Sequence, residues 1–213
     1  MKTNKPQTAS YWKKRKISDR ERDWLYNKDT WVEDYWESRK HPHRQLILEQ
    51  LSKLAPFTEI GEVGCNAGPN IANIRAKFRK ARIWGIDASP DAIALCRKNF
   101  VGKNVVAQTG DFLKIPWENK SMDVVIADAV LMYSDKNNVQ KALKELLRVA
   151  KKAIILVERE TPTTQLTGMV WAHPYTELLK GMGLKVTKTK IRKKDWTESR
   201  NWYKYGYVIT AKL

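Results

Sequence analysis

A glycine-rich turn between an apolar run and a helical pattern constrains this chain more than any other feature. The apolar run over residues 57–63 predicts a short buried strand, and the apolar spacing over residues 71–78 predicts a helix. Between them, Gly64 and Gly68 can adopt positive φ and let a ligand approach the main chain. Asn66 stands where a third glycine is common, and asparagine tolerates positive φ better than most residues. The segment therefore predicts a strand, a ligand-binding turn and a helix.

Acidic residues end or follow three further apolar runs. They are Asp87, Asp111 and Asp128. In an open parallel sheet, the carboxyl ends of the strands meet at one edge and form the ligand crevice. Asp87 lies 23 residues after Gly64, a spacing that suits a carboxylate accepting the hydroxyls of a ribose. The alternative for Asp87 is that it only ends a strand, but the convergence of all three acids favours a site.

The order of the elements predicts one α/β domain. A chain of 213 residues with 42% hydrophobic content can bury a full core. Apolar strands alternate with helical patterns, so we expect a sheet with helices on both faces, closed by an antiparallel pair of strands at the C-terminus. An exposed polar hairpin loop is expected over residues 192–201. The expected helices are about 43–54, 69–79, 89–100, 136–150 and 174–182, and the last three strands are expected near 153–158, 184–191 and 202–211.

From about residue 45 to residue 213, the chain resembles the class I S-adenosylmethionine-dependent methyltransferases. The resemblance implies a Rossmann-like, seven-stranded, mostly parallel sheet. The Cys-Asn-x-Gly-x-Asn form of residues 65–70 is similar to a bacterial-type branch found with small-molecule or sugar-modification genes. A nicotinamide enzyme, the nearest alternative, would show its third glycine nearer the helix. The motifs that carry the resemblance are Glu62-Val63-Gly64-Cys65-Asn66-Ala67-Gly68, Gly85-Ile86-Asp87, Gly110-Asp111-Phe112, Asp123-Val124-Val125-Ile126-Ala127-Asp128 and residues 146–158.

The resemblance implies that S-adenosylmethionine binds along the carboxyl edge of the sheet. The turn at residues 64–68 would contact its methionine part, and Asp87 would bind the ribose hydroxyls. Asp111 and Phe112 would flank the adenine. Asp128 would lie near the sulfonium. The complete set expected at the cofactor is Glu62, Gly64, Cys65, Asn66, Gly68, Asn70, Asp87, Ala88, Asp111, Phe112, Asp128 and Ala129.

The chemistry implied is transfer of the sulfonium methyl to an oxygen or nitrogen by in-line displacement. The candidates for a catalytic base are His173, Asp128 and Tyr133. We favour a small-molecule acceptor, such as a sugar or a secondary metabolite, because of the branch resemblance. The alternatives are an RNA or DNA methyltransferase, and a binding module that kept the fold without the chemistry.

The net charge of +17 is the second informative feature. Residues 1–22 carry a net charge of +6 and residues 185–213 carry +7, so basic segments at both ends could bind nucleic acid. Aromatic residues are interleaved with the second segment, as is common on nucleic-acid surfaces. The alternative is a solvated basic surface. These aromatic residues are Trp196, Trp202, Tyr203, Tyr205 and Tyr207.

The N-terminal part divides into two segments before the domain at residues 45–213. Residues 1–22 are expected to form a basic, disordered tail. Residues 23–44 are aromatic, and Trp24, Trp31 and Tyr35 recur near helical spacing. This segment can be an amphipathic helix docked on the domain. It can also be a lid over the cofactor, which we favour, and the two interpretations are compatible. The residues expected at the lid and substrate are Tyr35, Trp36, Arg39 and Arg44, the last reaching the cofactor carboxylate.

Other classes of protein receive little support. Cys65 and Cys96 are too few for a disulfide framework. His41 and His43 are weak signals for a metal, and no metal site is expected. No apolar run is long enough to span a membrane and no leader pattern is present, so we expect a soluble cytoplasmic protein. The sequence does not indicate an oligomeric state.

Overall fold

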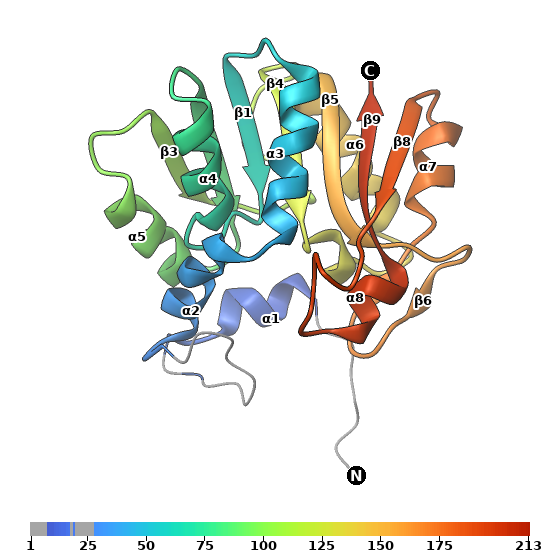
Figure 1. Cartoon of the computed structure of the whole chain (residues 1–213), viewed down its shortest axis with the longest axis horizontal. Helices are drawn as coiled ribbons and strands as arrows, with labels where there is room; N and C mark the ends of the chain where they lie inside the picture. The colour runs from blue at the N-terminus through green and yellow to red at the C-terminus, as the bar shows by residue number, and fades with distance from the viewer. Residues whose placement is uncertain (1–7, 18, 20–27) are drawn as a thin grey trace.

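A seven-stranded sheet forms the centre of the molecule. The computed structural model describes residues 8–17, 19 and 28–213. The strand order is β3-β2-β1-β4-β5-β9-β8 (Figure 1), with β1 to β5 parallel and β9 antiparallel to both neighbours. The predicted mostly parallel Rossmann-like sheet with its antiparallel C-terminal pair is therefore confirmed. The strands are β1 (Glu59–Val63), β2 (Arg82–Asp87), β3 (Val105–Thr109), β4 (Met122–Asp128), β5 (Ala150–Arg159), β8 (Lys185–Lys190) and β9 (Gly206–Lys212).

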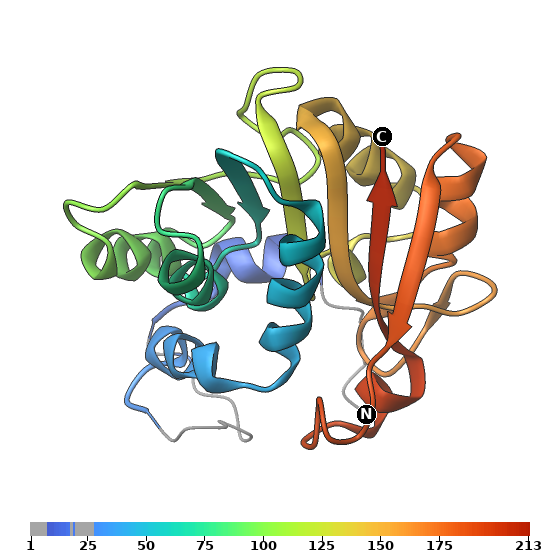
Figure 2. The same ribbon diagram turned by 45° about the horizontal axis from the view of Figure 1, so that its top comes forward.

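Helices cover both faces of this sheet. In Figures 1 and 2, α3 and α4 cross the front face, whereas α6 lies behind it. All five predicted helices are present. Local signals begin two of them, because Pro69 and the Ser89-Pro90 pair occupy helix starts, and the Ser89 hydroxyl accepts the Ala92 N–H. The helices are α3 (His43–Leu54), α4 (Pro69–Lys77), α5 (Pro90–Asn99), α6 (Val139–Val149) and α7 (Tyr175–Gly181).

The core consists of one apolar layer on each side of the sheet. The central strand β4 is buried along almost its whole length, as expected for a parallel strand covered on both faces. One layer includes Ile47, Ile71 and Ile93 from α3, α4 and α5. The other includes Leu143 and Leu179 from α6 and α7. This packing fixes the carboxyl ends of β1, β2 and β4 relative to one another.

Short helices lie across the carboxyl edge of the sheet (Figure 1). They are α1 (Ala9–Lys14) and α2 (Trp31–Glu37), and a 3-10 turn, η1 (Ser38–Lys40), follows α2. A capping box begins α2, because Thr30 and Glu33 exchange side-chain to backbone hydrogen bonds. Helix α1 falls within the segment expected to be a tail, and Trp24 lies outside the described residues. The short pair β6 (Gln165–Leu166) and β7 (Trp171–Ala172) and the 3-10 turn η2 (Leu131–Tyr133) also lie after the carboxyl ends of the parallel strands.

The prediction of a final strand over residues 202–211 was wrong at its start. Arg200–Tyr205 form a short helix, α8, and the strand begins at Gly206. Trp202 stacks on Trp196 with ring centroids 3.9 Å apart, and the Gly206 N–H donates to the Trp202 carbonyl. A Cβ at Gly206 would lie 2.4 Å from that carbonyl oxygen. Tertiary stacking and a close turn thus override the strand propensity of this aromatic run.

The segment 192–201 is also not a fully exposed hairpin loop. Asp195 is buried, and Trp196 lies between the rings of His43 and Trp202. Trp202 is 4% exposed, so it cannot offer a free face to a nucleic acid. The interleaving of aromatic and basic residues near the C-terminus therefore reflects, in part, packing within the protein.

Candidate active site

A cleft opens where the carboxyl ends of β1, β2 and β4 meet. It contains eight of the residues predicted at the cofactor: Gly64, Asn66, Asp87, Ala88, Asp111, Phe112, Asp128 and Ala129. Trp12 and Tyr35 of the N-terminal helices and Tyr133 after β4 form an aromatic margin. The remaining lining residues are Val63, Ile86, Gly110 and Val130.

The glycine turn has the backbone that the sequence predicts. Gly64 has φ of +73°, and a Cβ there would lie 2.1 Å from the Val130 side chain. Gly68 has φ of +88° and caps the N-terminus of α4. Asn66 has φ of +49°, the left-handed conformation that asparagine tolerates better than most residues. Ala129 has φ of +57°, an uncommon value for alanine that the sequence did not reveal.

Asp87 connects the turn to the cleft. Its Oδ2 accepts the Asn66 N–H at 2.9 Å, and its Oδ1 accepts the Ser89 N–H at 2.8 Å. Burial raises the pKa of Asp87, although these two backbone N–H groups oppose the shift. The carboxylate is thus fixed at the end of β2 and faces the cleft, as a ligand for ribose hydroxyls must.

Asp111 has a partner that the sequence did not suggest. Lys13 of α1 reaches its Oδ2 at 3.0 Å, and the Leu113 N–H donates to its Oδ1 at 2.9 Å. Burial acts to raise the pKa of Asp111, but the Leu113 N–H and the Lys13 ammonium outweigh it, so the pKa is lowered. Helix α1 therefore holds one wall of the cleft through an ion pair, and Phe112 lies beside it.

Asp128 is the charged centre of the site. Its Oδ2 accepts from His43 Nε2 at 3.0 Å, from Arg44 at 2.9 Å and from Asn70 Nδ2 at 2.9 Å. Burial opposes ionisation, but His43, Arg44 and Asn70 outweigh it and hold the pKa of Asp128 well below its usual range. The other oxygen, Oδ1, is buried and has no hydrogen-bond partner among the described residues. The site therefore contains an ionised carboxylate with one unsatisfied acceptor.

Two further buried carboxyl groups are protonated at neutral pH. Burial raises the pKa of Glu62 to about 8, and its Oε1 accepts from Asn70 Nδ2 at 2.8 Å. Burial likewise raises the pKa of Glu158 to about 8. Its Oε1 accepts the N–H groups of Val130 and Leu131 at 2.8 and 2.6 Å. Glu62 and Glu158 are therefore neutral supports of the glycine turn and of the segment after β4.

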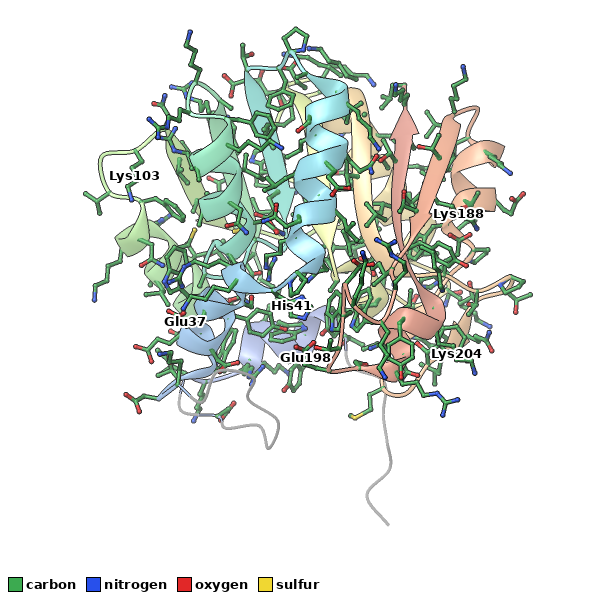
Figure 3. The ribbon with its side chains drawn as sticks, viewed as in Figure 1. Glu37, His41, Lys103, Lys188, Glu198 and Lys204 are labelled. Carbon is green, nitrogen blue, oxygen red and sulfur yellow. The ribbon has the colours of Figure 1, made fainter. Side chains whose placement is uncertain are left out.

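A chain of side chains runs from Asp128 toward solvent. His43 contacts Asp128 through Nε2 and His41 through Nδ1, and His41 Nε2 lies 2.8 Å from Glu198 Oε2. Figure 3 shows His41 and Glu198 close together at the carboxyl edge. Burial acts to raise the pKa of Glu198, but the hydrogen bond from His41 outweighs it, so the pKa is lowered. Burial lowers the pKa of His43 to about 4, although the neighbouring Asp128 carboxylate opposes the shift.

Several predicted residues lie outside the cleft lining. The structure does not bring His173 to it: Nε2 is bonded to the Ser134 carbonyl at 2.9 Å and Nδ1 to the Thr164 hydroxyl at 3.1 Å. Trp36 packs against Phe100 instead. The Arg39 guanidinium binds Glu37, and the Arg44 guanidinium binds Asp128 and Ser38. The other predicted residues outside the lining are Glu62, Cys65, Gly68 and Asn70.

Sequence reasoning missed Trp12, Lys13 and the role of His43. Trp12 makes edge-to-face contacts with Tyr35 and Tyr133, with centroids 6.0 and 5.4 Å apart. The adjacent aromatic pair Tyr11-Trp12 within a polar run was the available signal for α1. No comparable local signal connects His43 with Asp128, because their contact depends on the fold.

The described part of the chain shows neither a metal site nor a membrane span. Within residues 8–17, 19 and 28–213, no group of His, Cys, Asp and Glu side chains could hold a metal ion. No helix in the same ranges combines the length and the apolar character that a bilayer crossing requires.

Comparison with known proteins identifies the domain. Residues 60–153 match the family model of a methyltransferase domain. The match includes the glycine turn, Asp87, Asp111 and Asp128. A crystal structure of magnesium protoporphyrin IX methyltransferase from Synechocystis with bound SAM is similar at a TM-score of 0.64 and 16% identity, over 96% of this chain and 94% of that one. These findings confirm the family that the motifs resemble.

Two other similar proteins do not indicate a methyl acceptor. The putative methyltransferase in complex with the Haloferax volcanii Trm112 activator has a TM-score of 0.64 and 17% identity, over 84% of this chain and 94% of that one. An uncharacterized Haemophilus influenzae protein is 26% identical over 141 residues, which are 63% of this chain and 53% of that protein. The chain spans between 40% and 53% of the length of the curated relatives that it matches.

Replacing Glu62 with glutamine should change the pH dependence of stability. Between pH 4.5 and about 8 the folded chain holds a proton at Glu62 that the unfolded chain has lost. The contribution of this bound proton to the free energy of unfolding is complete below pH 4.5 and is lost as the pH rises toward 8. Relative to wild type, the free energy of unfolding of Glu62→Gln should therefore increase with pH, by up to about 1.4 kcal/mol per pH unit.

Urea denaturation across this pH range measures the effect. Glu49→Gln, at an exposed position of α3, is the matched control and should shift stability by the same amount at every pH. Parallel curves for wild type and Glu62→Gln would show that Glu62 is ionised in the folded protein.

Arg44 and Asp128 should show strong energetic coupling. Arg44→Met leaves a buried carboxylate without its guanidinium partner and should lower the free energy of unfolding by about 3–5 kcal/mol. Asp128→Asn leaves the Arg44 guanidinium without its counter-charge and should also destabilise. The double variant removes both charges, so its loss should be smaller than the sum of the two single losses.

A double-mutant cycle measured by urea denaturation tests this pair. The hydrogen bonds from Arg44 to Ser38 are lost in both variants that lack Arg44, so they cancel in the cycle. Additive losses would contradict a direct interaction between Arg44 and Asp128.

Proposed function

We propose that this chain binds S-adenosylmethionine in the cleft and transfers its methyl group to an oxygen or nitrogen of a small-molecule acceptor. The unsatisfied Oδ1 of the ionised Asp128 is the observation that carries the proposal. A buried anionic oxygen needs a donor or a cation, and the cofactor is cationic at both its ammonium and its sulfonium groups. Binding of S-adenosylmethionine would satisfy that requirement.

The other cleft residues fit the remaining parts of the cofactor. Asp87 would accept ribose hydroxyls, since its oxygens each accept only one backbone N–H and keep further acceptor capacity. Asp111 and Phe112 would hold the adenine by a hydrogen bond and by packing. A Cβ at Gly64 would clash with Val130, so glycine keeps the turn closely packed at the wall of the cleft.

The cofactor supplies the activated methyl group, and the protein aligns the acceptor with it. The acceptor proton would leave to a base or to solvent. Asp128 is a poor base, because its pKa lies well below the usual range. Its role is to bind positive charge and to keep that charge oriented.

Tyr133 is the better-placed candidate for contact with the acceptor. It lies at the aromatic margin of the cleft, whereas both ring nitrogens of His173 are bonded elsewhere. Trp12 and Tyr35 complete this margin and would exclude water from the transfer. The aromatic margin supports a small acceptor, and helix α1 together with α2 would act as the lid.

A nucleic-acid acceptor is the second candidate, supported by the net charge of +17. The basic terminal segments favour such an acceptor. Within them, however, Trp202 is buried and Lys13 is paired with Asp111, so neither side chain is free to contact a nucleic acid. Methylation of nucleic acid would depend steeply on salt, whereas methylation of a small neutral acceptor would not.

Asp87→Asn should weaken the binding of S-adenosylhomocysteine at least about tenfold. The variant keeps one oxygen for the backbone but loses the charge that strengthens hydrogen bonds to the ribose. Isothermal titration calorimetry with S-adenosylhomocysteine measures this change. Asp91→Asn, in the first turn of α5, removes the same charge outside the cleft lining and should bind normally. Equal affinities of wild type and Asp87→Asn would contradict the proposed cofactor site.

A further inference from the structure

A second groove lies on the outer side of α4 and α5, apart from the catalytic cleft. Its lining contains three cationic side chains, Arg75, Arg79 and Lys103, and no acidic one. Two aromatic rings, Trp36 and Phe100, form its inner wall with centroids 5.9 Å apart. Figure 3 shows Lys103 at the outer margin of the molecule, on the side away from Lys188 and β8.

The segment that supplies most of this groove is basic, as the two terminal segments are. Residues 71–106 contain eight Lys and Arg residues and two acidic residues, a net charge of +6. Of the two acids, Asp87 faces the catalytic cleft and Asp91 lies at the opposite end of α5 from the groove. The three cationic side chains of the groove therefore form a positive surface within a segment of positive net charge.

Neighbouring acids do not neutralise that surface. Glu37 of α2 is already paired with Arg39 at 2.9 Å and with Lys40 at 2.6 Å. The hydrogen bond from Lys40, together with that from Arg39, lowers the pKa of Glu37 to about 2, so the carboxylate stays ionised and is balanced by the two cations. Arg39 also lies over the Trp36 ring, 4.7 Å from its centroid, which adds a further cation beside the groove.

Helix capping accounts for only part of this arrangement. Lys103 Nζ donates to the Asn99 carbonyl at 2.9 Å and Arg75 donates to the Arg79 carbonyl at 2.9 Å, as basic side chains near helix C-termini do. Each of these bonds uses one donor of a group that has several. Capping also does not account for Trp36, a half-buried ring in the same groove, whereas Phe100 is 6% exposed and belongs to the core.

We propose that this groove binds single-stranded nucleic acid. Cations without acidic neighbours fit a phosphate backbone, and aromatic or guanidinium planes fit unpaired bases. A duplex hides its bases, so an open groove with an aromatic wall fits a single strand better. The inference concerns binding alone and does not depend on which acceptor the enzyme methylates.

Fluorescence anisotropy with a labelled twelve-nucleotide oligouridylate tests the groove. The logarithm of the affinity should fall linearly with the logarithm of salt concentration, and each neutralised phosphate should contribute a slope of about −0.7. The double variant Arg79→Ala/Lys103→Ala should lower the steepness of that slope by about 1.4. Both residues are exposed, so the variant should remain folded.

Matched variants separate the groove from general charge. Lys53→Ala/Lys144→Ala removes the same charge from exposed positions on α3 and α6 and should retain the wild-type slope. Trp36→Leu should weaken binding about fivefold or more, without changing the slope, because stacking is lost and no charge is removed. Binding of S-adenosylhomocysteine should be unchanged in the two double variants, which keeps this test separate from that of the cofactor site.

Four outcomes would overturn the proposal. They are no binding by the wild type, equal losses in the groove and control double variants, equal or tighter binding of a duplex of the same length, and equal affinity for free uridine monophosphate. The last result would show that the groove takes a single nucleotide rather than a strand.

Discussion

The buried ionised carboxylate of Asp128 is the interaction on which the rest of the site depends. It lies at the end of β4, and its Oδ2 binds Arg44 and His43 from α3 and Asn70 from α4. A buried charge is tolerated only when it is paired and hydrogen-bonded. This requirement ties two helices to the carboxyl edge of the sheet and leaves Oδ1 for a ligand.

Two buried carboxyl groups beside Asp128 are neutral, so the negative charge of this cluster lies on Asp128. Glu62 and Glu158 flank Asp128 on the neighbouring strands β1 and β5, and burial raises the pKa of each to about 8. Ionising all three would place like charges close together in a medium of low polarity. The neutral pair can instead support the backbone, while Asp128 is the one of these three carboxyl groups that is ionised. Such separation of protonation states suits binding of a cationic cofactor.

The sequence predicted the strands and the acids because both have local or topological signals. Apolar runs define the buried strands, and parallel strands necessarily bring Asp87, Asp111 and Asp128 to one edge. Helix α1 has six residues, too few to be stable alone, so its position depends on docking of Trp12. The contact between His43 and Asp128 joins residues 85 apart and leaves no periodic pattern. Long-range packing likewise creates the Trp36 and Phe100 wall of the second groove.

A crystal structure with S-adenosylhomocysteine tests the central claim most directly. The account predicts that the ribose hydroxyls contact Asp87 and that the ligand's ammonium group contacts Asp128 Oδ1, while His43, Arg44 and Asn70 keep their bonds to Oδ2. A ligand bound elsewhere, or bound in the cleft with Asp128 Oδ1 still lacking a partner, would contradict the assignment of Asp128 as the residue that holds the cationic end of the cofactor.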